Sequence, residues 1–172
     1  MRLAFLTTLA VFSALPASAQ VRVAIGEEVV FALGGAAEQS VRRTPAEANA
    51  FETFIGAKFA GGQFKEATGA SGVGMRDQPE KPPAPRAEAA KIRVRFTPTP
   101  QGHSLLVIEN GYDQGLIYRA TITARGRTAP TDVCLVMPGK AGVEHWPFEI
   151  ASIELTDFRL VAWKPGDRAP CA

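Results

Sequence analysis

The fold is decided by the stretch Lys-Ile-Arg-Val-Arg-Phe-Thr at residues 91–97, in which polar and apolar side chains alternate strictly. Successive side chains of a β-strand point to opposite faces of the sheet, so this spacing predicts a strand that buries Ile92, Val94 and Phe96 on one face. Pro98 follows, and proline cannot donate a hydrogen bond to a neighbouring strand. We therefore expect a half-buried strand that ends at this proline.

Short strand-like runs separated by turn residues continue toward the C-terminus. Residues 104–109 are almost uniformly apolar and residues 116–123 alternate. An Asn-Gly pair opens the connection between these two runs, which predicts a β-hairpin. Residues 132–137 form a further expected strand, and a loop is expected to follow it up to residue 147.

The last apolar segment covers residues 148–163 and is also expected to be a strand. Its alternation slips near Ser152 and again near Thr156, so we expect first a bulge and then a turn or bend. Five or six such strands, punctuated by glycine and proline, favour an antiparallel architecture.

The N-terminal third predicts two more strands and one helix. Residues 21–33 alternate around a glycine, which indicates two short strands or one strand with a glycine break. Residues 44–47 read Thr-Pro-Ala-Glu, which combines a capping threonine, a proline at the first helical position and a glutamate three residues after the cap. Phenylalanines then recur at helical spacing until the glycines at residues 61–62. We expect a helix docked on the core, with a ligand groove along its phenylalanines as the alternative.

These elements together predict a mainly β protein: an antiparallel immunoglobulin-like β-sandwich, or a barrel, with one short N-terminal α-helix. The expected parts are an N-terminal strand/helix region at residues 20–75, a proline-rich linker at residues 76–90 and the sandwich core at residues 91–172. Strands from residues 21–33 are candidates to complete that core. A ligand for a proline-recognising domain is the alternative interpretation of the linker.

Residues 1–19 are predicted to be a secretory signal peptide. A basic Arg2 precedes an apolar run at residues 3–15, and Pro16 with an Ala-Ser-Ala site follows. The run would rise about 20 Å as a helix, short of the roughly 30 Å needed to span a bilayer. We expect cleavage after Ala19, a periplasmic or secreted bacterial protein, and no transmembrane segment in the mature chain.

The chain has 2 cysteines, Cys134 and Cys171. In an exported protein the default prediction is a disulfide between them, which would tie the C-terminal tail to the sandwich. The alternative is a free catalytic thiol, which requires a histidine that lowers its pKa.

Charge excludes one class of partner and suggests another. The 19 Lys and Arg against 17 Asp and Glu give a net charge of +2, too small for a nucleic-acid binder. Residues 91–127, however, carry six basic side chains against two acidic ones. If the strands of Arg93, Arg95 and Arg119 pair, a basic face forms that would bind an anionic envelope polymer or an acidic envelope protein. The alternative is an ordinary solvated face with arginines that guard an edge.

A second candidate surface is the Glu-His-Trp-Pro segment at residues 144–147. Trp146 is expected to fold back as a lid on the core, with a loop tip at which His145 and Trp146 recognise a partner as the alternative. The only other histidine is His103, and its spacing from His145 matches neither a blue-copper nor a zinc motif. We therefore predict no metal, no cofactor and no catalytic residue.

The expected function is a non-enzymatic exported module that binds an envelope protein or polymer. This expectation rests on a plausible sandwich without a recognisable catalytic motif. Two alternatives remain: a small periplasmic enzyme whose site is assembled from loops, for example around His103 or His145, and a structural or assembly subunit.

Overall fold

The computed structural model describes residues 20–34, 41–62, 82–167 and 170–171. The predicted signal peptide at residues 1–19 and the first part of the predicted linker lie outside the described residues. The elements are β1 (Val21–Ala24), β2 (Glu27–Phe31), β3 (Arg42–Pro45), α1 (Ala50–Ala60), β4 (Ile92–Pro98), β5 (Ser104–Asn110), β6 (Gly115–Ala124), β7 (Arg127–Thr131), β8 (Ala141–Trp146) and β9 (Ser152–Val161).

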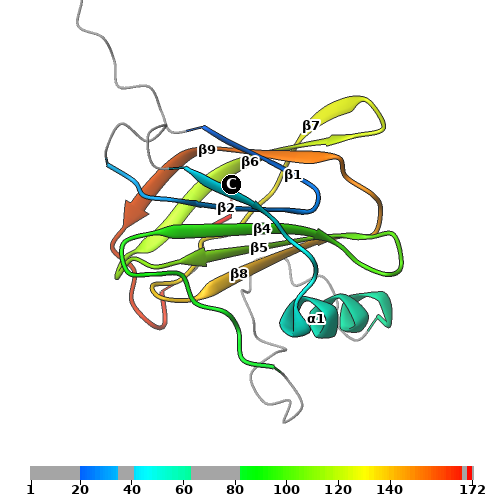
Figure 1. The fold of residues 1–172 in the computed structure, drawn as a ribbon. Helices are drawn as coiled ribbons and strands as arrows, with labels where there is room; N and C mark the ends of the chain where they lie inside the picture. The colour runs from blue at the N-terminus through cyan, green and yellow to red at the C-terminus, as the bar shows by residue number, and fades with distance from the viewer. Residues whose placement is uncertain (1–19, 35–40, 63–81, 168–169, 172) are drawn as a thin grey trace, which may run out of the picture.

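The strands form two antiparallel sheets that stack face to face (Figure 1). The four-stranded sheet has the order β1-β9-β6-β7, and the five-stranded sheet has the order β3-β2-β4-β5-β8. The mainly β prediction with one short helix is confirmed. Among the described strands neither sheet closes on itself, so the barrel alternative is not supported, and these strand orders do not confirm an immunoglobulin-like topology.

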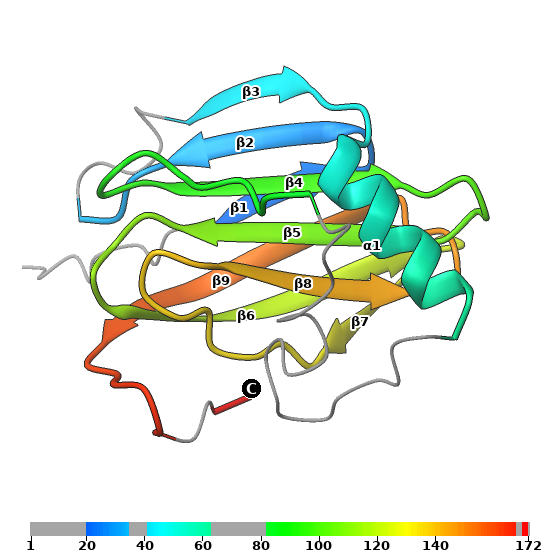
Figure 2. The same cartoon turned by 90° about the horizontal axis from the view of Figure 1, so that it is seen from below.

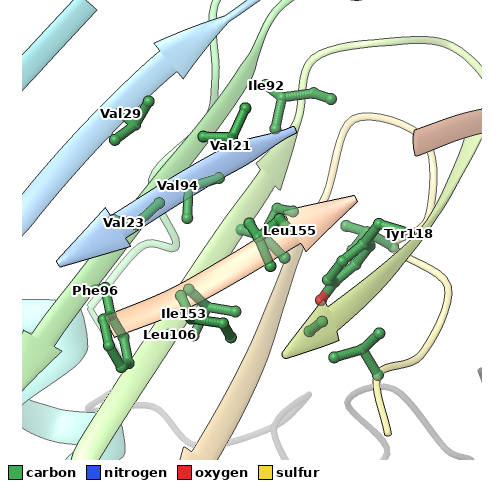
Figure 3. Close-up of a cluster of buried hydrophobic side chains, with 14 of the residues drawn as sticks. Val21, Val23, Val29, Ile92, Val94, Phe96, Leu106, Tyr118, Ile153 and Leu155 are labelled. Atoms are coloured by element: carbon green, nitrogen blue, oxygen red, sulfur yellow. The ribbon is translucent and has the colours of Figure 1, made fainter. Parts of the chain in front are cut away.

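The core lies between the sheets and contains side chains from both of them (Figure 3). The alternation at residues 91–97 is confirmed, because Ile92, Val94 and Phe96 are fully buried. Leu155 and Tyr118 face them from the four-stranded sheet. Burying such apolar area is the main favourable term for folding.

The two N-terminal strands belong to different sheets, since β1 pairs with β9 and β2 pairs with β4. Gly26 makes this possible with a φ of 82°, a conformation that favours glycine. The amide of Ile25 donates to Ala151 O, and the amide of Gly26 donates to Phe96 O, so the turn bonds to both sheets. Of the two expectations for residues 21–33, the one with two strands is correct.

The hairpin predicted between residues 104–109 and 116–123 is wrong. β5 pairs with β4 and β8, whereas β6 pairs with β7 and β9 in the other sheet. The chain crosses between the sheets at Asn110, whose Nδ2 donates to Gln114 O and Val136 O. Both runs bury apolar side chains in the same interior, so they face each other across it and do not lie side by side.

The prediction for residues 127–147 is also wrong in detail. Residues 132–137 make isolated β-bridges, at Cys134 and Val136, and do not form a continuous strand. The supposed loop after them contains β8, which pairs with β5 from Ser104↔Trp146 to Glu109↔Ala141. β7 was not expected at all; it follows a tight turn at Arg125 and Gly126.

The helix begins later than predicted. Residues 42–45 form β3, an exposed edge strand on β2, so Thr44 is not the N-cap. Asn49 caps α1, and its side chain and that of Glu52 accept each other's backbone amide, which is a complete capping box. The predicted end at the glycines is confirmed, since α1 stops at Ala60 with Gly61 as the C-cap. Within the described ranges, no helix is long and apolar enough to span a membrane.

The last strand, β9, runs from residue 152 to 161 without the expected turn. The pairing with β6 shifts between Ile117 and Arg119, and Asp157 on β9 has a φ of 54° there. The bulge therefore exists near Thr156, where a turn or bend was expected, and Ser152 simply opens the strand.

Candidate functional site

The outer surface of the five-stranded sheet is the face that α1 crosses, on the side away from the other sheet (Figure 2). We call it the helix-bearing face. Phe51 and Ile55 of α1 pack there against Leu105 and Val107 of β5 in a small apolar cluster separate from the main core. The helix thus runs from the β2–β4 side, at its N-terminus, to β8, at its C-terminus.

Buried ion pairs fix the N-terminal end of α1. Nε of Arg95 donates to Oε1 of Glu52 at 2.6 Å, and Nη1 donates to Oε2 of Glu28 at 2.7 Å. Nη2 reaches the Glu47 carbonyl at 2.7 Å. The hydrogen bond that Arg95 donates to Glu52 raises the pKa of the guanidinium, and burial opposes this increase only in part. One arginine therefore joins β4, β2 and the helix.

A second ion pair occupies the neighbouring arginine. Nε of Arg93 donates to Oε2 of the fully buried Glu109 at 2.9 Å, and Nη2 donates to the Arg86 carbonyl at 2.7 Å. Burial nevertheless raises the pKa of Glu109, since Arg93 compensates only part of the desolvation.

These contacts mean that the predicted basic face does not form. Arg93 and Arg95 share one face of β4, as expected, but both are paired with carboxylates. Arg119 lies on β6 in the other sheet, with a side chain 71% exposed and a loose contact to Asp157 at 3.6 Å. The condition that the strands of these arginines pair is not met, because β4 and β6 belong to different sheets.

The C-terminal end of α1 meets a pair of histidines. Nδ1 of His103 and Nε2 of His145 are 3.0 Å apart, and the ring of Phe59 stacks on His145 with centroids 4.5 Å apart and planes 7° from parallel. We call these three residues the histidine rim. Both imidazoles are half-buried, so solvent reaches them. The structure thus brings together two residues that are 42 positions apart.

Strand pairing explains this proximity. His145 lies on β8 opposite Leu105, and His103 sits in the turn just before β5. Sequence spacing does not reveal the pair, because residues 141–146 lack the alternation of a strand and a loop is expected there. The signal lies in the register, since a strand at residues 141–146 beside residues 104–109 places the two histidines close together.

The environment of His145 keeps its imidazole uncharged. Burial, and then the neighbouring His103, lower the pKa of His145 to about 4. At neutral pH the ring is therefore neutral, and one of its nitrogens carries a free electron pair or accepts a hydrogen bond.

Trp146 is a lid on the core and does not lie at a loop tip. It is only 9% exposed, its ring contacts Phe96 edge to face at 6.2 Å, and Nε1 donates to Thr131 Oγ1 at 3.3 Å. Its neighbour His145 points to the opposite face of β8, as strand geometry requires. Of the two residues, His145 alone belongs to the helix-bearing face.

Glu144 lies on the inner side of β8, opposite Leu106, and is an unusual carboxyl group. Burial raises its pKa to about 7, a hydrogen bond from the Cys134 amide lowers it in part, and Asp132 adds repulsion. The carboxyl group is thus half-protonated near neutral pH.

Glu144→Gln is expected to stabilise the protein by about 1–2 kcal/mol at pH 8 and to change little at pH 5, after allowance for solvent screening. Because the folded-state pKa is raised from 4.5 to about 7, the contribution of Glu144 is favourable below pH 4.5 and is lost as the pH rises toward 7. Glutamine avoids that loss and still accepts the Cys134 amide. Urea unfolding at both pH values measures the difference.

His145 gives this prediction an internal control. Its pKa is lowered from 6.5 to about 4, so its contribution is present above pH 6.5 and is lost as the pH falls toward 4. In the wild type the pH dependence that His145 gives to the free energy of unfolding therefore opposes the one that Glu144 gives. In Glu144→Gln the free energy of unfolding should rise from pH 4 to pH 6.5. A variant with the same pH profile as the wild type would contradict the raised pKa of Glu144.

The described residues contain no group of three or more His, Cys, Asp or Glu side chains placed to hold a metal ion. Cys134 and Cys171 form the predicted disulfide, so the alternative of a free catalytic thiol is wrong. Comparisons with protein-family models, curated proteins and solved structures gave no match to this chain.

Proposed function

We propose that this chain is an exported, non-enzymatic binding module, a β-sandwich that contacts a component of the cell envelope through the histidine rim. The observation that carries the proposal is the half-buried imidazole pair of His103 and His145 beside Phe59. Export is inferred from residues 1–19, and a disulfide suits an oxidising compartment.

Ion pairs anchor the helix that carries Phe59, which favours binding because an anchored surface loses less freedom when a partner docks. Arg95 and Glu52 lock the start of α1 to the sheet. At the other end, Nζ of Lys58 lies 5.3 Å above the ring centre of Phe54, next to the turn of helix that carries Phe59. The surface therefore offers aromatic rings, imidazoles and one cation, groups that serve both apolar and polar contacts.

Binding to the envelope can be tested with the mature chain, residues 20–172, and sedimented envelope vesicles from the native host. His103→Ala and His145→Ala are expected to weaken retention at least tenfold. Arg119→Ala, on the opposite sheet, is the matched control and should bind as the wild type does. Circular dichroism checks that each variant is folded; equal retention of all variants would remove the rim as the binding surface.

A second function is favoured by the same hydrogen bond. A neutral imidazole that a second histidine orients can accept a proton, and its pKa of about 4 makes His145 a weak general base. If the chain is instead a small enzyme, some substrate class must be turned over by the wild type and not by His145→Ala. Screening hydrolase substrates with both proteins decides between the two functions.

A further inference from the structure

The geometry points to a metal site: we propose that His103 and His145 together bind a divalent late transition-metal ion, Cu²⁺ most tightly. This inference rests on the proposed function, since it names the ligand class of the histidine rim. The two nitrogens that face each other are 3.0 Å apart. Two ligands at about 2.0–2.1 Å from one metal, at angles of 90–110°, are about 2.8–3.4 Å apart, so the observed spacing suits a shared ion.

The chemistry of the donors selects the metal. Imidazole nitrogen is a good ligand for Cu²⁺, Zn²⁺ and Ni²⁺, and among divalent first-row ions Cu²⁺ binds nitrogen donors most strongly. In the free protein Nδ1 of His103 and Nε2 of His145 contact each other as donor and acceptor, and a bound metal takes the place of the proton between them. That proton moves to the other nitrogen of its ring or leaves to solvent.

The surroundings hold both rings in place, as second-shell contacts do in metal sites. Phe59 stacks on His145 and restricts its rotation. Two hydrogen bonds between Thr99 and His103 close the turn that carries His103. The Thr99 amide donates to His103 O at 2.9 Å, and the His103 amide donates to Thr99 Oγ1 at 3.3 Å. The Thr99 side chain in turn packs on Gly56 of α1, where even a methyl group would meet it at 2.9 Å.

The site is an open one. Within the described parts of the chain only two protein ligands converge, so water or a donor group from the partner must complete the coordination. Open sites of this kind exchange their ion and bind an incoming ligand at the free positions. We therefore infer that the metal lies where the envelope partner docks.

Titration of the untagged mature chain with CuSO₄ and ZnCl₂ tests the site. We expect one Cu²⁺ per chain, a weaker Zn²⁺ interaction, and an electron paramagnetic resonance spectrum with coupling to two imidazole nitrogens. His103→Ala and His145→Ala should each lower the Cu²⁺ affinity at least thirtyfold, whereas Arg119→Ala should not change it. Because the chain has only 2 histidines, the double variant measures all background binding.

Two results would overturn the metal site: the absence of stoichiometric Cu²⁺ binding by the wild type, or equal binding by the double variant. The failure of the proposed function gives a different pattern. If Cu²⁺ binds at the rim but envelope retention is unaffected by both histidine variants, the metal site stands and the envelope module does not. If the variants lose envelope retention but the wild type binds no metal, the envelope module stands and the metal site does not.

Discussion

Replacing Arg95 with methionine is expected to lower the free energy of unfolding by about 3–5 kcal/mol, because a buried carboxylate then loses its cation. Glu52 is the most buried member of this network. Its side chain is 0% exposed, and Oε1 accepts a hydrogen bond from Nε of Arg95 at 2.6 Å. Glu28 loses its partner as well, and the Glu47 carbonyl loses a donor. Chemical unfolding at pH 7, followed by circular dichroism, measures the change.

Two further variants separate this effect from the simple loss of an arginine. Arg119→Met removes a pair whose side chains are 71% and 49% exposed, and should cost less than about 0.5 kcal/mol. Adding Glu52→Gln to Arg95→Met should recover part of the loss, since a neutral amide needs no cation and still accepts the Asn49 amide. A loss below about 1 kcal/mol for Arg95→Met would show that the pair does not hold α1.

The local patterns of the sequence predicted those elements whose two faces differ. β4 is the clearest case, because Ile92, Val94 and Phe96 alternate with arginines. β8 was missed because its first five residues are all half-buried and it contains Gly142, so no alternation marks it. The small residue is required there, since a Cβ would meet Val136 Cγ2 at 2.9 Å.

The start of the helix shows how two similar signals compete. Thr44 and Asn49 each stand three residues before a glutamate, and both fit a capping box. Thr44 lies instead in β3, where it pairs with Glu28 of β2. No local pattern reveals this long-range pairing. Glu52 can then serve both Asn49 and Arg95, which fixes the choice.

The candidate site was only partly predictable for the same reason. His145 was recognised as a surface residue, but its contact with His103 depends on the register of β5 and β8. The basic face failed because the partners of Arg93 and Arg95 come from β5, β2 and α1, none of which could be placed beside β4 from charge alone. The disulfide was predictable because 2 cysteines allow one pairing and the first nineteen residues predict export.

Replacing both Cys134 and Cys171 with serine is expected to lower the free energy of unfolding by about 3–4 kcal/mol. The bond joins residues separated by 37 positions, and the chain it encloses contains β8 and β9. Without the bond the unfolded chain gains the freedom to separate these ends. The folded state should change little, because the Leu135 amide still donates to Pro170 O at 2.9 Å.

The measurement compares urea unfolding of the wild type, the double serine variant, and the wild type with a reductant. The last two should coincide, since both lack the same covalent bond and keep the same hydrogen bonds. Thiol labelling of the unfolded, non-reduced wild type should find no free thiol. If the double variant is as stable as the wild type, the bond does not constrain the unfolded chain enough to matter. The disulfide then serves only to hold the C-terminal tail.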